Sequence, residues 1–449
     1  MAAMTDLWKR SRITKALTDG ARADSFAEAE ARLDSIHVAV ALGRNQMDTP
    51  AGQAAALTAV ATARKCFGQV TLVMEGDARL LASLPLGKTL RHAARSLGAR
   101  LVEDAPRTTT HTISIGNASG MGWTVRCWWD RWLAGTRQAA GDGPGDSRLA
   151  LTGAFAAAVA MRQIFACALA AKTLRPRDVT VNLWEPWSAA GSGAIGPATF
   201  DVPNSIWFLG LGHLGQGFIW NLCLLGVRGG RAVAQDNQLI GDENEATSLL
   251  VLPTDLGSKK ARVAGRWLEA CGWKTDIIER RHHGDIQVTP EDPPYLLCGL
   301  DRLQPRLIMA RHGFEFMIDA GLGHGAHDFE GIQIRTIAKG NSIEGLWNEA
   351  AQPRHDALHA RLMETKAYAD LEAQIGRCGI VGFAEASTAV PFVGAATGAL
   401  VIAQAIRLAS LQPAARFLHM ELGAPEMVAD AGVTPGPSVN LGTIPTSLS

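Results

Sequence analysis

Three glycines between an apolar strand and an apolar helix give the strongest chemical signal in this sequence. The stretch IWFLGLGHLGQGFIWNLCLLG, residues 206–226, places them at Gly210, Gly212 and Gly215. Such a turn lets the backbone approach a phosphate and points the N-terminus of the helix at it. The pattern predicts a nucleotide site, and a tight turn without a ligand is the alternative explanation of the same spacing.

A carboxylate follows at the end of the next predicted strand, RAVAQD, at Asp236. In this position it can accept hydrogen bonds from both hydroxyl groups of a ribose. The glycines and Asp236 together are consistent with a nicotinamide-dependent dehydrogenase and equally with an enzyme that adenylates its substrate.

Charged residues further along the chain favour chemistry on phosphate. In DLGSKKARVAGRWLEACG a glycine precedes Lys259 and Lys260 at the start of an amphipathic helix, and in YLLCGLDRLQPR Asp301 ends an apolar strand, with Arg306 five residues later. A lysine and a carboxylate that binds Mg²⁺ can stabilise charge on an α-phosphate under attack. Hydride transfer needs neither. A solvated helix start and a helix cap are the alternative explanations for the lysines and for Asp301.

Hydrophobic patterning predicts the elements that position these residues. In the second half it predicts strands at 206–210, 231–235, 275–280, 295–300, 316–320 and 331–337, and helices at 215–226, at 259–271 and from Pro391 onward. The first half alternates in the same way, from a strand at 36–43 to a long apolar helix at 149–172. This alternation predicts an α/β fold with parallel strand pairing.

The two halves meet near a loop-like segment at 185–204 and end in similar small-residue helices, LTGAFAAAVAMRQIF and FVGAATGALVIAQAI. This similarity indicates a duplicated unit. Because only the second half has a glycine-rich turn, only the second half is expected to bind nucleotide.

Composition narrows the class of protein. The 449 residues carry no net charge, which argues against nucleic acid and anionic membranes as partners. The seven cysteines include no C-x-x-C pair, and the N-terminus has no apolar signal core, so we expect a cytoplasmic protein without structural zinc. We interpret the apolar stretches at 149–171 and 391–408 as buried helices rather than membrane spans.

Taken together, these motifs make the second half similar to the adenylation domain of the ubiquitin-activating enzyme family, including its ThiF and MoeB type proteins. The resemblance covers residues 206–408 and rests on GLGHLGQG, Asp236, GSKKA with Lys260, LDRLQPR with Asp301 and Arg306, and the closing helix PFVGAATGALVIAQAIRL. It implies a Rossmann-like adenylation domain with a mixed sheet that binds ATP through the glycine turn, Asp236, Lys260 and Arg306, and Mg²⁺ through Asp301.

The sequence departs from the family in two motifs. Where the family has an Asn-Leu-x-Arg-Gln run, this chain has DENEATSLL, so the phosphate-binding arginine is missing and Asn244 is the candidate substitute. The zinc-binding C-x-x-C pair of the family is also absent.

The resemblance also implies a nucleophile, and the sequence offers more than one candidate for it. Cys378 lies in the position of the family's crossover segment, just after residues 340–377, and a buried structural cysteine is the alternative. Ser387 and Thr388 lie just before Pro391 and would give an ester instead of a thioester.

In this family the active domain pairs with a second copy, in a partner subunit or in the same chain. We therefore expect residues 1–190 to form a degenerate, related α/β domain, residues 200–412 the active domain with its crossover segment, and residues 413–449 an extended or disordered tail. A homodimer and an intrachain pseudo-dimer are both possible. Arg12, in LWKRSR, is the residue expected to reach the ATP site, and a solvated charge cluster is the alternative.

The function implied is activation of the C-terminal glycine of a ubiquitin-like protein, followed by transfer to an enzyme nucleophile and to a conjugating-enzyme-like protein. The overall pattern resembles bacterial activating enzymes linked to phage defence, and either protein conjugation or sulfur transfer fits it. An NAD(P)-dependent oxidoreductase and a non-catalytic scaffold for a ubiquitin-like protein are the competing hypotheses.

Overall fold

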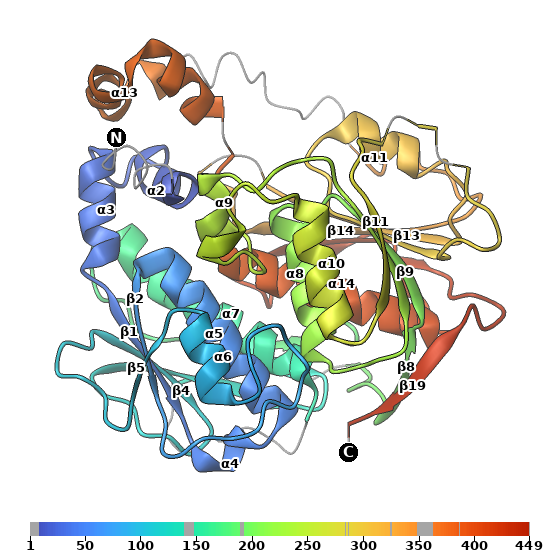
Figure 1. Ribbon diagram of the computed structural model, residues 1–449, viewed down its shortest axis with the longest axis horizontal. Coiled ribbons are helices and arrows are strands. Elements are labelled where there is room, and N and C mark those ends of the chain that lie inside the picture. Colours follow the sequence, from blue (N-terminus) through green and yellow to red (C-terminus); the bar gives the residue numbers. More distant parts are fainter. Residues whose placement is uncertain are drawn as a thin grey trace.

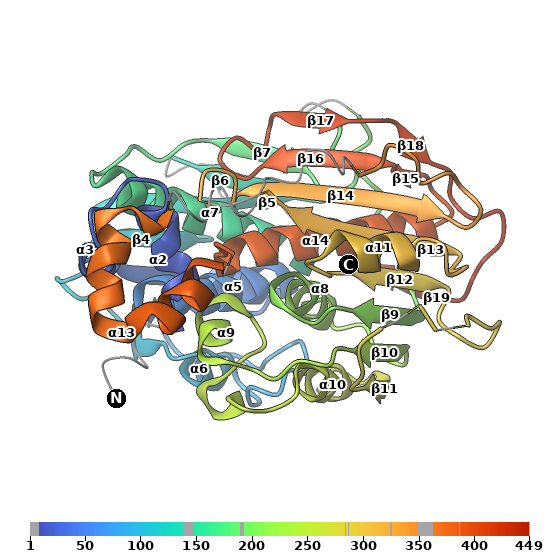
Figure 2. The same ribbon diagram turned by 90° about the horizontal axis from the view of Figure 1, so that it is seen from above.

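The chain folds into two α/β halves, each built on its own sheet (Figure 1). The computed structural model describes residues 9–138, 148–188, 193–282, 284–285, 287–323, 326–347, 362–385 and 387–448. Helices α5, α7, α8 and α14 lie between the two sheets (Figures 1 and 2).

The N-terminal half contains a seven-stranded sheet in the order β3-β2-β1-β4-β5-β6-β7. Its strands are β1 (His37–Leu42), β2 (Gln69–Val73), β3 (Arg100–Val102), β4 (His111–Ile115), β5 (Trp123–Asp130), β6 (Leu133–Arg137) and β7 (Val179–Asn182). Its helices are α2 (Ser11–Thr18), α3 (Phe26–Asp34), α4 (Arg44–Met47), α5 (Pro50–Phe67), α6 (Leu90–Ser96) and α7 (Ala150–Ala170). The first five strands in chain order pair in parallel, and β6 and β7 are antiparallel.

The C-terminal half contains an eight-stranded sheet in the order β11-β10-β9-β12-β13-β14-β16-β17. Its strands are β9 (Ser205–Leu209), β10 (Arg231–Gln235), β11 (Lys274–Ile278), β12 (Tyr295–Cys298), β13 (Phe316–Leu322), β14 (Gly331–Ala338), β16 (Phe417–Glu421) and β17 (Val428–Asp430). Its helices are α8 (His213–Leu224), α9 (Asp242–Thr247), α10 (Lys260–Ala270), α11 (Leu303–Met309), α13 (Lys366–Glu385) and α14 (Pro391–Ala409), with a short 3₁₀ turn at Pro253–Asp255.

The two halves share one topology, so the α/β, Rossmann-like, two-domain fold expected from the sequence is confirmed. In both sheets the first strand is central, the next two lie on one side of it and the fourth and fifth on the other, and antiparallel strands complete the sheet. The long apolar helix follows the sixth strand in each half, as α7 and as α14.

The two halves also share a hydrogen bond, which a glutamine in the long helix of each half forms with the backbone. Gln163 in α7 accepts a hydrogen bond from the backbone N–H of Arg177 at 2.7 Å, just before β7. Gln404 in α14 accepts one from the backbone N–H of Ala415 at 2.9 Å, just before β16. Equivalent helices therefore hold the equivalent returning strand in the two halves.

Small residues let the helices between the sheets approach closely. A Cβ atom added to Gly153 in α7 would lie 2.0 Å from the carbonyl oxygen of Ala51 in α5, and one added to Gly217 in α8 would lie 2.1 Å from that of Gly394 in α14. Backbone meets backbone at these contacts within each half. Helix α7 packs against α14 between the halves, and one continuous hydrophobic core joins them.

Helices α7 and α14 are also long and apolar enough to span a membrane. In the most apolar window of α7, 78% is buried inside the protein, and the corresponding window of α14 is completely buried. Packing within the fold thus explains the hydrophobicity of both helices.

The C-terminal segment differs from the extended or disordered tail that we expected for residues 413–449. It forms β15 (Ala414–Ala415), β16, β17, β18 (Val433–Thr434) and β19 (Thr443–Ser447). Strand β16 extends the large sheet because Leu418 and Met420 alternate into the core, and β19 pairs with β8 (Thr199–Pro203). The C-terminal half therefore includes the segment that was assigned to the tail.

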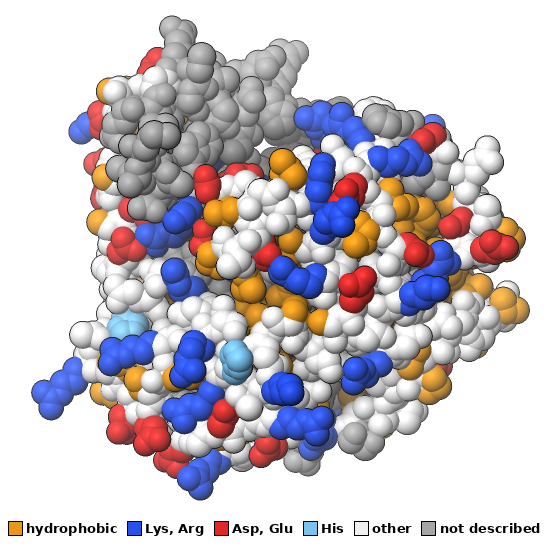
Figure 3. Space-filling view, in the orientation of Figure 1, with side chains coloured by type: hydrophobic (Ala, Val, Ile, Leu, Met, Phe, Trp, Pro, Cys, Tyr) orange, Lys and Arg blue, Asp and Glu red, His pale blue; other side chains and the backbone are white. Residues whose placement is uncertain are grey.

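Charges are mixed over the face of the molecule seen in Figure 3. Lysine and arginine side chains are interspersed with aspartate and glutamate side chains over both halves. This distribution agrees with the zero net charge of the chain.

Candidate functional site

The glycine turn connects β9 to α8 at the carboxyl ends of the parallel strands. Gly210 has φ +78°, and a Cβ on Gly215 would lie 2.1 Å from the carbonyl oxygen of Gly210. Gly212, which precedes the first residue of α8, has no atom within 4 Å of such a Cβ. Packing explains the first two glycines, whereas the open space over Gly212 and the helix N-terminus could hold a phosphate.

Strand order places this turn at a topological switch point. The chain runs from β9 to β10 and β11 on one side of β9, and it then crosses to β12 on the other side. In open α/β sheets the crevice at the carboxyl ends of two such strands is where ligands bind.

Asp236 braces the turn. Its carboxylate accepts hydrogen bonds from the backbone N–H groups of Leu211 and Gln238, both at 2.7 Å. Each carboxylate oxygen has a further lone pair, so Asp236 can hold the turn and still accept hydrogen bonds from a ribose.

Lys260 is the first residue of α10 and is buried, with 6% of its surface exposed. Its ammonium donates to Gln238 Oε1 at 2.7 Å. Burial lowers its pKa, and the neighbouring carboxylates of Asp236, Glu243 and Asp301 oppose that change. Lys259 instead donates to the carbonyl oxygen of Asn237 and is more exposed than Lys260. Of the two adjacent lysines, Lys260 is the one within this group of charges.

Arg12 comes from α2, in the N-terminal half of the same chain. Its guanidinium donates to the carbonyl oxygen of Ser387 at 2.7 Å and to the hydroxyl of Ser387. Burial lowers its pKa, and the charges of Glu243 and Asp301 oppose the change. Two segments 375 residues apart therefore meet at one site, and the pairing of halves that we considered occurs within one chain.

Glu243 in α9 was not singled out by the sequence, although it belongs to the DENEATSLL motif. Its charge acts on both Arg12 and Lys260, as does the charge of the exposed Asp301. The motif contains three acidic residues, and nothing local distinguishes Glu243 from Asp242 and Glu245. Only the packing of α2 against α9 identifies it.

Two residues expected to bind nucleotide have structural partners. Asn244 is buried, and its side chain accepts a hydrogen bond from the backbone N–H of Gly241 at 2.9 Å, which caps α9. Arg306 donates to the carbonyl oxygen of Leu300 at 2.8 Å and pairs with the buried Asp319 at 3.3 Å. Arg306 therefore binds the backbone of the residue that precedes Asp301.

The two candidate nucleophiles lie in and just after α13: Cys378 is in the helix, and Ser387 follows it. Cys378 lies in α13, two residues after a kink at Gly376 (φ +73°), and its side chain lies outside the described part of the structure. The six cysteines whose side chains are described, at positions 66, 127, 167, 223, 271 and 298, are buried. Burial raises the pKa of the Cys66 and Cys298 thiols, which makes them poor nucleophiles.

Helix α13 docks on the N-terminal helices (Figure 1). Lys15 in α2 donates to the hydroxyl of Tyr368 at 2.6 Å, and the ring of Tyr368 meets that of Phe26 edge to face at 5.4 Å. The N-terminal half therefore contacts the helix that carries Cys378 as well as the glycine-turn site.

The equivalent turn of the N-terminal half is filled by protein atoms. After β1 the chain forms α4, and Asn45 accepts a hydrogen bond from the backbone N–H of Asn117 at 2.9 Å. A Cβ on Gly43 would lie 2.1 Å from the side-chain oxygen of Asn117. Protein atoms therefore lie against Gly43 in this half, whereas the space over Gly212 in the C-terminal half is open. That the N-terminal half does not bind nucleotide stays a prediction.

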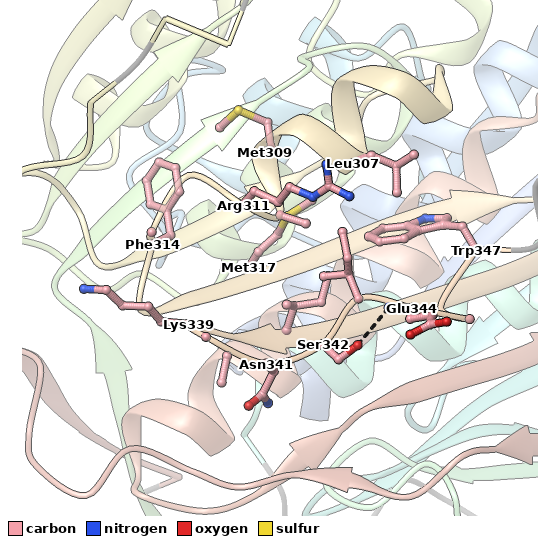
Figure 4. Close-up of a pocket in the computed structure, with 17 residues that line it drawn as sticks. Leu307, Met309, Arg311, Phe314, Met317, Lys339, Asn341, Ser342, Glu344 and Trp347 are labelled. Atoms are coloured by element: carbon pink, nitrogen blue, oxygen red, sulfur yellow. Dashed lines mark hydrogen bonds between the residues drawn. The ribbon is translucent and has the colours of Figure 1, made fainter.

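A cavity lies away from the glycine turn, between α11 and the strands β13 and β14. Its volume is about 1040 Å³, and its walls include Phe314, Met317, Ile337 and Trp347 (Figure 4). Arg311 points into it in Figure 4. The buried indole N–H of Trp347 has no hydrogen-bond partner among the described residues.

His213, the first residue of α8, is expected to make the fold acid-sensitive. Burial, with the nearby charge of Arg12, lowers its pKa to about 3, and its Nε2 lies 2.9 Å from the carbonyl oxygen of Val390. The unfolded chain binds a proton below about pH 6.5 and the folded chain does not. The free energy of unfolding should therefore fall from about pH 6.5 downward, by about 1.4 kcal/mol per pH unit.

Urea unfolding of the wild type and of His213→Gln between pH 7 and pH 4 tests this expectation. Glutamine can still donate to Val390 but cannot titrate, so its curve should be shallower by about one proton. Parallel curves for the two proteins would contradict the assignment.

The fold and the site define a protein of two Rossmann-like domains in one chain, in which the first domain supplies a basic residue to the glycine-turn site of the second. Residues 37–183 match the family model described as BilD N-terminal domain, and residues 202–411 match the one described as BilD C-terminal domain.

The chain is also similar to the Bacterial E1-like protein BilD of Collimonas sp. (strain OK412). The two are 29% identical over 409 residues, which cover 88% of this chain and 87% of that protein. The resemblance to activating enzymes is thus supported at the level of an E1-like protein, and the more specific likeness to ThiF-type proteins stays a prediction.

Proposed function

We propose that this chain uses ATP to activate the C-terminal glycine carboxylate of a ubiquitin-like protein. In the reaction a carboxylate oxygen of the partner attacks the α-phosphorus of ATP, an acyl–phosphate bond forms, and the bond to the pyrophosphate oxygen breaks. A thiolate of the enzyme then attacks the acyl carbon and releases AMP, and the thioester passes to a conjugating-enzyme-like protein. The similarity to an E1-like protein supports this class of reaction.

One observation carries the proposal. Arg12 and Lys260, from opposite halves of the chain, lie within one group of charges beside the glycine turn. Two cations and a helix N-terminus suit the charge that develops on a triphosphate under attack. Hydride transfer to a nicotinamide requires no such pair, so the arrangement favours adenylation over an oxidoreductase.

The residues also fit Mg²⁺. Carboxylate oxygens are the ligands that this ion prefers, and the exposed Asp301 and the half-buried Glu243 both act on the two cations. Asp301 would hold the ion, with Glu243 as a second candidate ligand, and the ion would neutralise phosphate charge. Asp236 would orient the ribose.

Isotope exchange between pyrophosphate and ATP, measured with candidate ubiquitin-like proteins, tests the proposal. Exchange that requires the partner's C-terminal glycine supports adenylation. Folded protein that binds the partner without exchange favours the scaffold hypothesis, and oxidation of a reduced nicotinamide favours the oxidoreductase. A thioester that is lost in Cys378→Ala identifies the nucleophile, and an adduct that resists thiols points to Ser387 instead.

The cavity beside α11 is the docking site that we assign to the body of the ubiquitin-like partner. It combines an apolar wall that includes Trp347 with the cation Arg311. It also borders residues 339–345, where the chain leads from β14 toward the crossover segment.

Trp347→Ala is therefore expected to weaken binding of the ubiquitin-like protein about tenfold or more, because buried tryptophans dominate interfaces of this kind. Affinity for ATP should not change. Calorimetric titration with each ligand separately measures both effects. Leu81→Ala, at a hydrophobic residue that is 44% exposed in the N-terminal half, is the control. Equal partner affinity in Trp347→Ala and Leu81→Ala would remove the cavity from the proposal.

A further inference from the structure

A lysine of the N-terminal half holds the backbone of α9 and the turn that follows it. Lys65, in α5, donates hydrogen bonds from its ammonium to the carbonyl oxygen of Glu245 at 2.5 Å and to that of Val251 at 3.0 Å. Glu245 lies in the last turn of α9, where unpaired carbonyl groups attract a cation. The contact spans 180 residues of sequence and joins the two domains.

The segment held by Lys65 is part of the wall of the proposed nucleotide site. It includes Glu243, whose charge acts on Arg12 and Lys260. Helix α9 also packs against α2, the helix that carries Arg12. A shift of α9 would therefore change the position of a carboxylate relative to both cations.

The same segment is tied to the glycine turn through a second side chain. The backbone N–H of Leu250 donates to Gln216 Oε1 at 3.0 Å, and Gln216 donates in turn to the carbonyl oxygen of Leu211 at 3.1 Å. Lys65 holds residues on either side of Leu250, so it stabilises the position in which this relay forms.

Burying an ammonium group at a domain interface costs free energy unless hydrogen bonds or opposite charges compensate for the lost hydration. Burial lowers the pKa of Lys65 to about 8, and the positive charge of Arg64 adds to that effect. The carboxylates of Glu245 and Asp255 oppose it. An apolar side chain would avoid the desolvation, but it could not bind the two carbonyl groups.

We infer that Lys65 is a positioning residue of the nucleotide site, through which the degenerate domain fixes α9 and so sets the affinity of the active domain for ATP. The inference rests on the proposed function. It gives the N-terminal domain a second contribution to the site, separate from that of Arg12.

Lys65→Met tests the inference, because methionine keeps much of the apolar stem and removes the charge and the donors. Calorimetric titration of the full chain with ATP and Mg²⁺ should show about tenfold weaker binding, as expected for a lost hydrogen bond to a charged group. Hydrogen exchange in residues 242–252 should become faster. Lys65→Arg, which keeps a cation and its donors, should restore most of both properties.

Thr58→Val is the matched control at the same interface. It removes the hydrogen bond at 3.0 Å from Trp220 Nε1 in α8 to Thr58 in α5, without touching α9. This variant should unfold more easily but keep wild-type exchange in residues 242–252. A loss of ATP affinity as large as that of Lys65→Met would show that general loosening of the interface, and not Lys65, is responsible.

The pH dependence of ATP binding separates positioning from a purely structural role. Between pH 7 and pH 9 the wild type should lose more affinity than Lys65→Arg, because Lys65 gives up its proton in this range and an arginine does not. Lys260 is present in every variant, so any contribution from it cancels in the ratio of wild type to Lys65→Met, which is the quantity to follow. That ratio should fall toward one as the pH rises.

Unchanged ATP affinity and unchanged exchange in Lys65→Met would overturn the inference. Failure of the wild type to bind ATP would refute the proposed function instead, and the exchange of residues 242–252 would then decide alone whether Lys65 fixes α9.

Discussion

Lys260→Met is expected to reduce pyrophosphate exchange by about a hundredfold to a thousandfold, the usual loss when one group that stabilises developing charge is removed. The lysine lies at the start of α10 with its ammonium inside the group of charges around the glycine turn. Because the phosphates carry more charge in the transition state than the remaining cation can neutralise, the loss should fall mainly on the maximal rate.

The neighbouring lysine provides the control for this prediction. Lys259→Met removes the same charge one residue away, where the ammonium binds the carbonyl oxygen of Asn237. Exchange should stay within about threefold of the wild type, because a half-buried lysine that binds only a backbone carbonyl contributes little. If the two variants were equally impaired, the loss of a cation from this surface, and not the position of Lys260, would be the cause.

Arg12→Ala is expected to lower exchange by about a hundredfold, since it removes the other cation of the site. The guanidinium reaches Ser387 and acts on Glu243 and Asp301 from the N-terminal half. Added guanidinium ion should restore part of the rate, because the space of the side chain is left open. Exchange rates with and without the added ion measure this effect.

Arg10→Ala is the matched variant on the same segment. Arg10 forms an ion pair with Asp34 at 2.7 Å, within the N-terminal half. Its loss should reduce stability slightly and leave exchange intact. Full exchange activity in Arg12→Ala would show that the cation is a structural tie to Ser387 and takes no part in the reaction.

Local patterns were sufficient to predict the elements around the glycine turn. The period of the apolar residues and the three glycines gave β9, α8 and the place of Asp236, because each depends on neighbours in sequence. The similar closing helices also indicated the duplication, which α7 and α14 confirm. The glutamine of each helix accepts a hydrogen bond from the segment that leads to the following strand.

Contacts between distant segments could not be predicted in this way. Glu243 becomes part of the site only because α2 packs against α9, and Lys65 meets α9 across the two domains. Arg306 had the right spacing from Asp301, but a buried carboxylate, Asp319, engages it from below. The segment after residue 412 is rich in glycine and proline, so the short alternation of apolar and polar residues in β16 did not stand out as a strand.

The close packing of α5 and α7 against α8 and α14 makes the two domains a permanent pair. Two separate subunits would have to associate, and dilution would separate them. In one chain the covalent link fixes the effective concentration of the second domain, so dilution cannot lower it. Arg12 and Lys65 are therefore supplied to the site at any concentration of enzyme. Association of these two domains is therefore not a concentration-dependent step at which such a protein could be controlled.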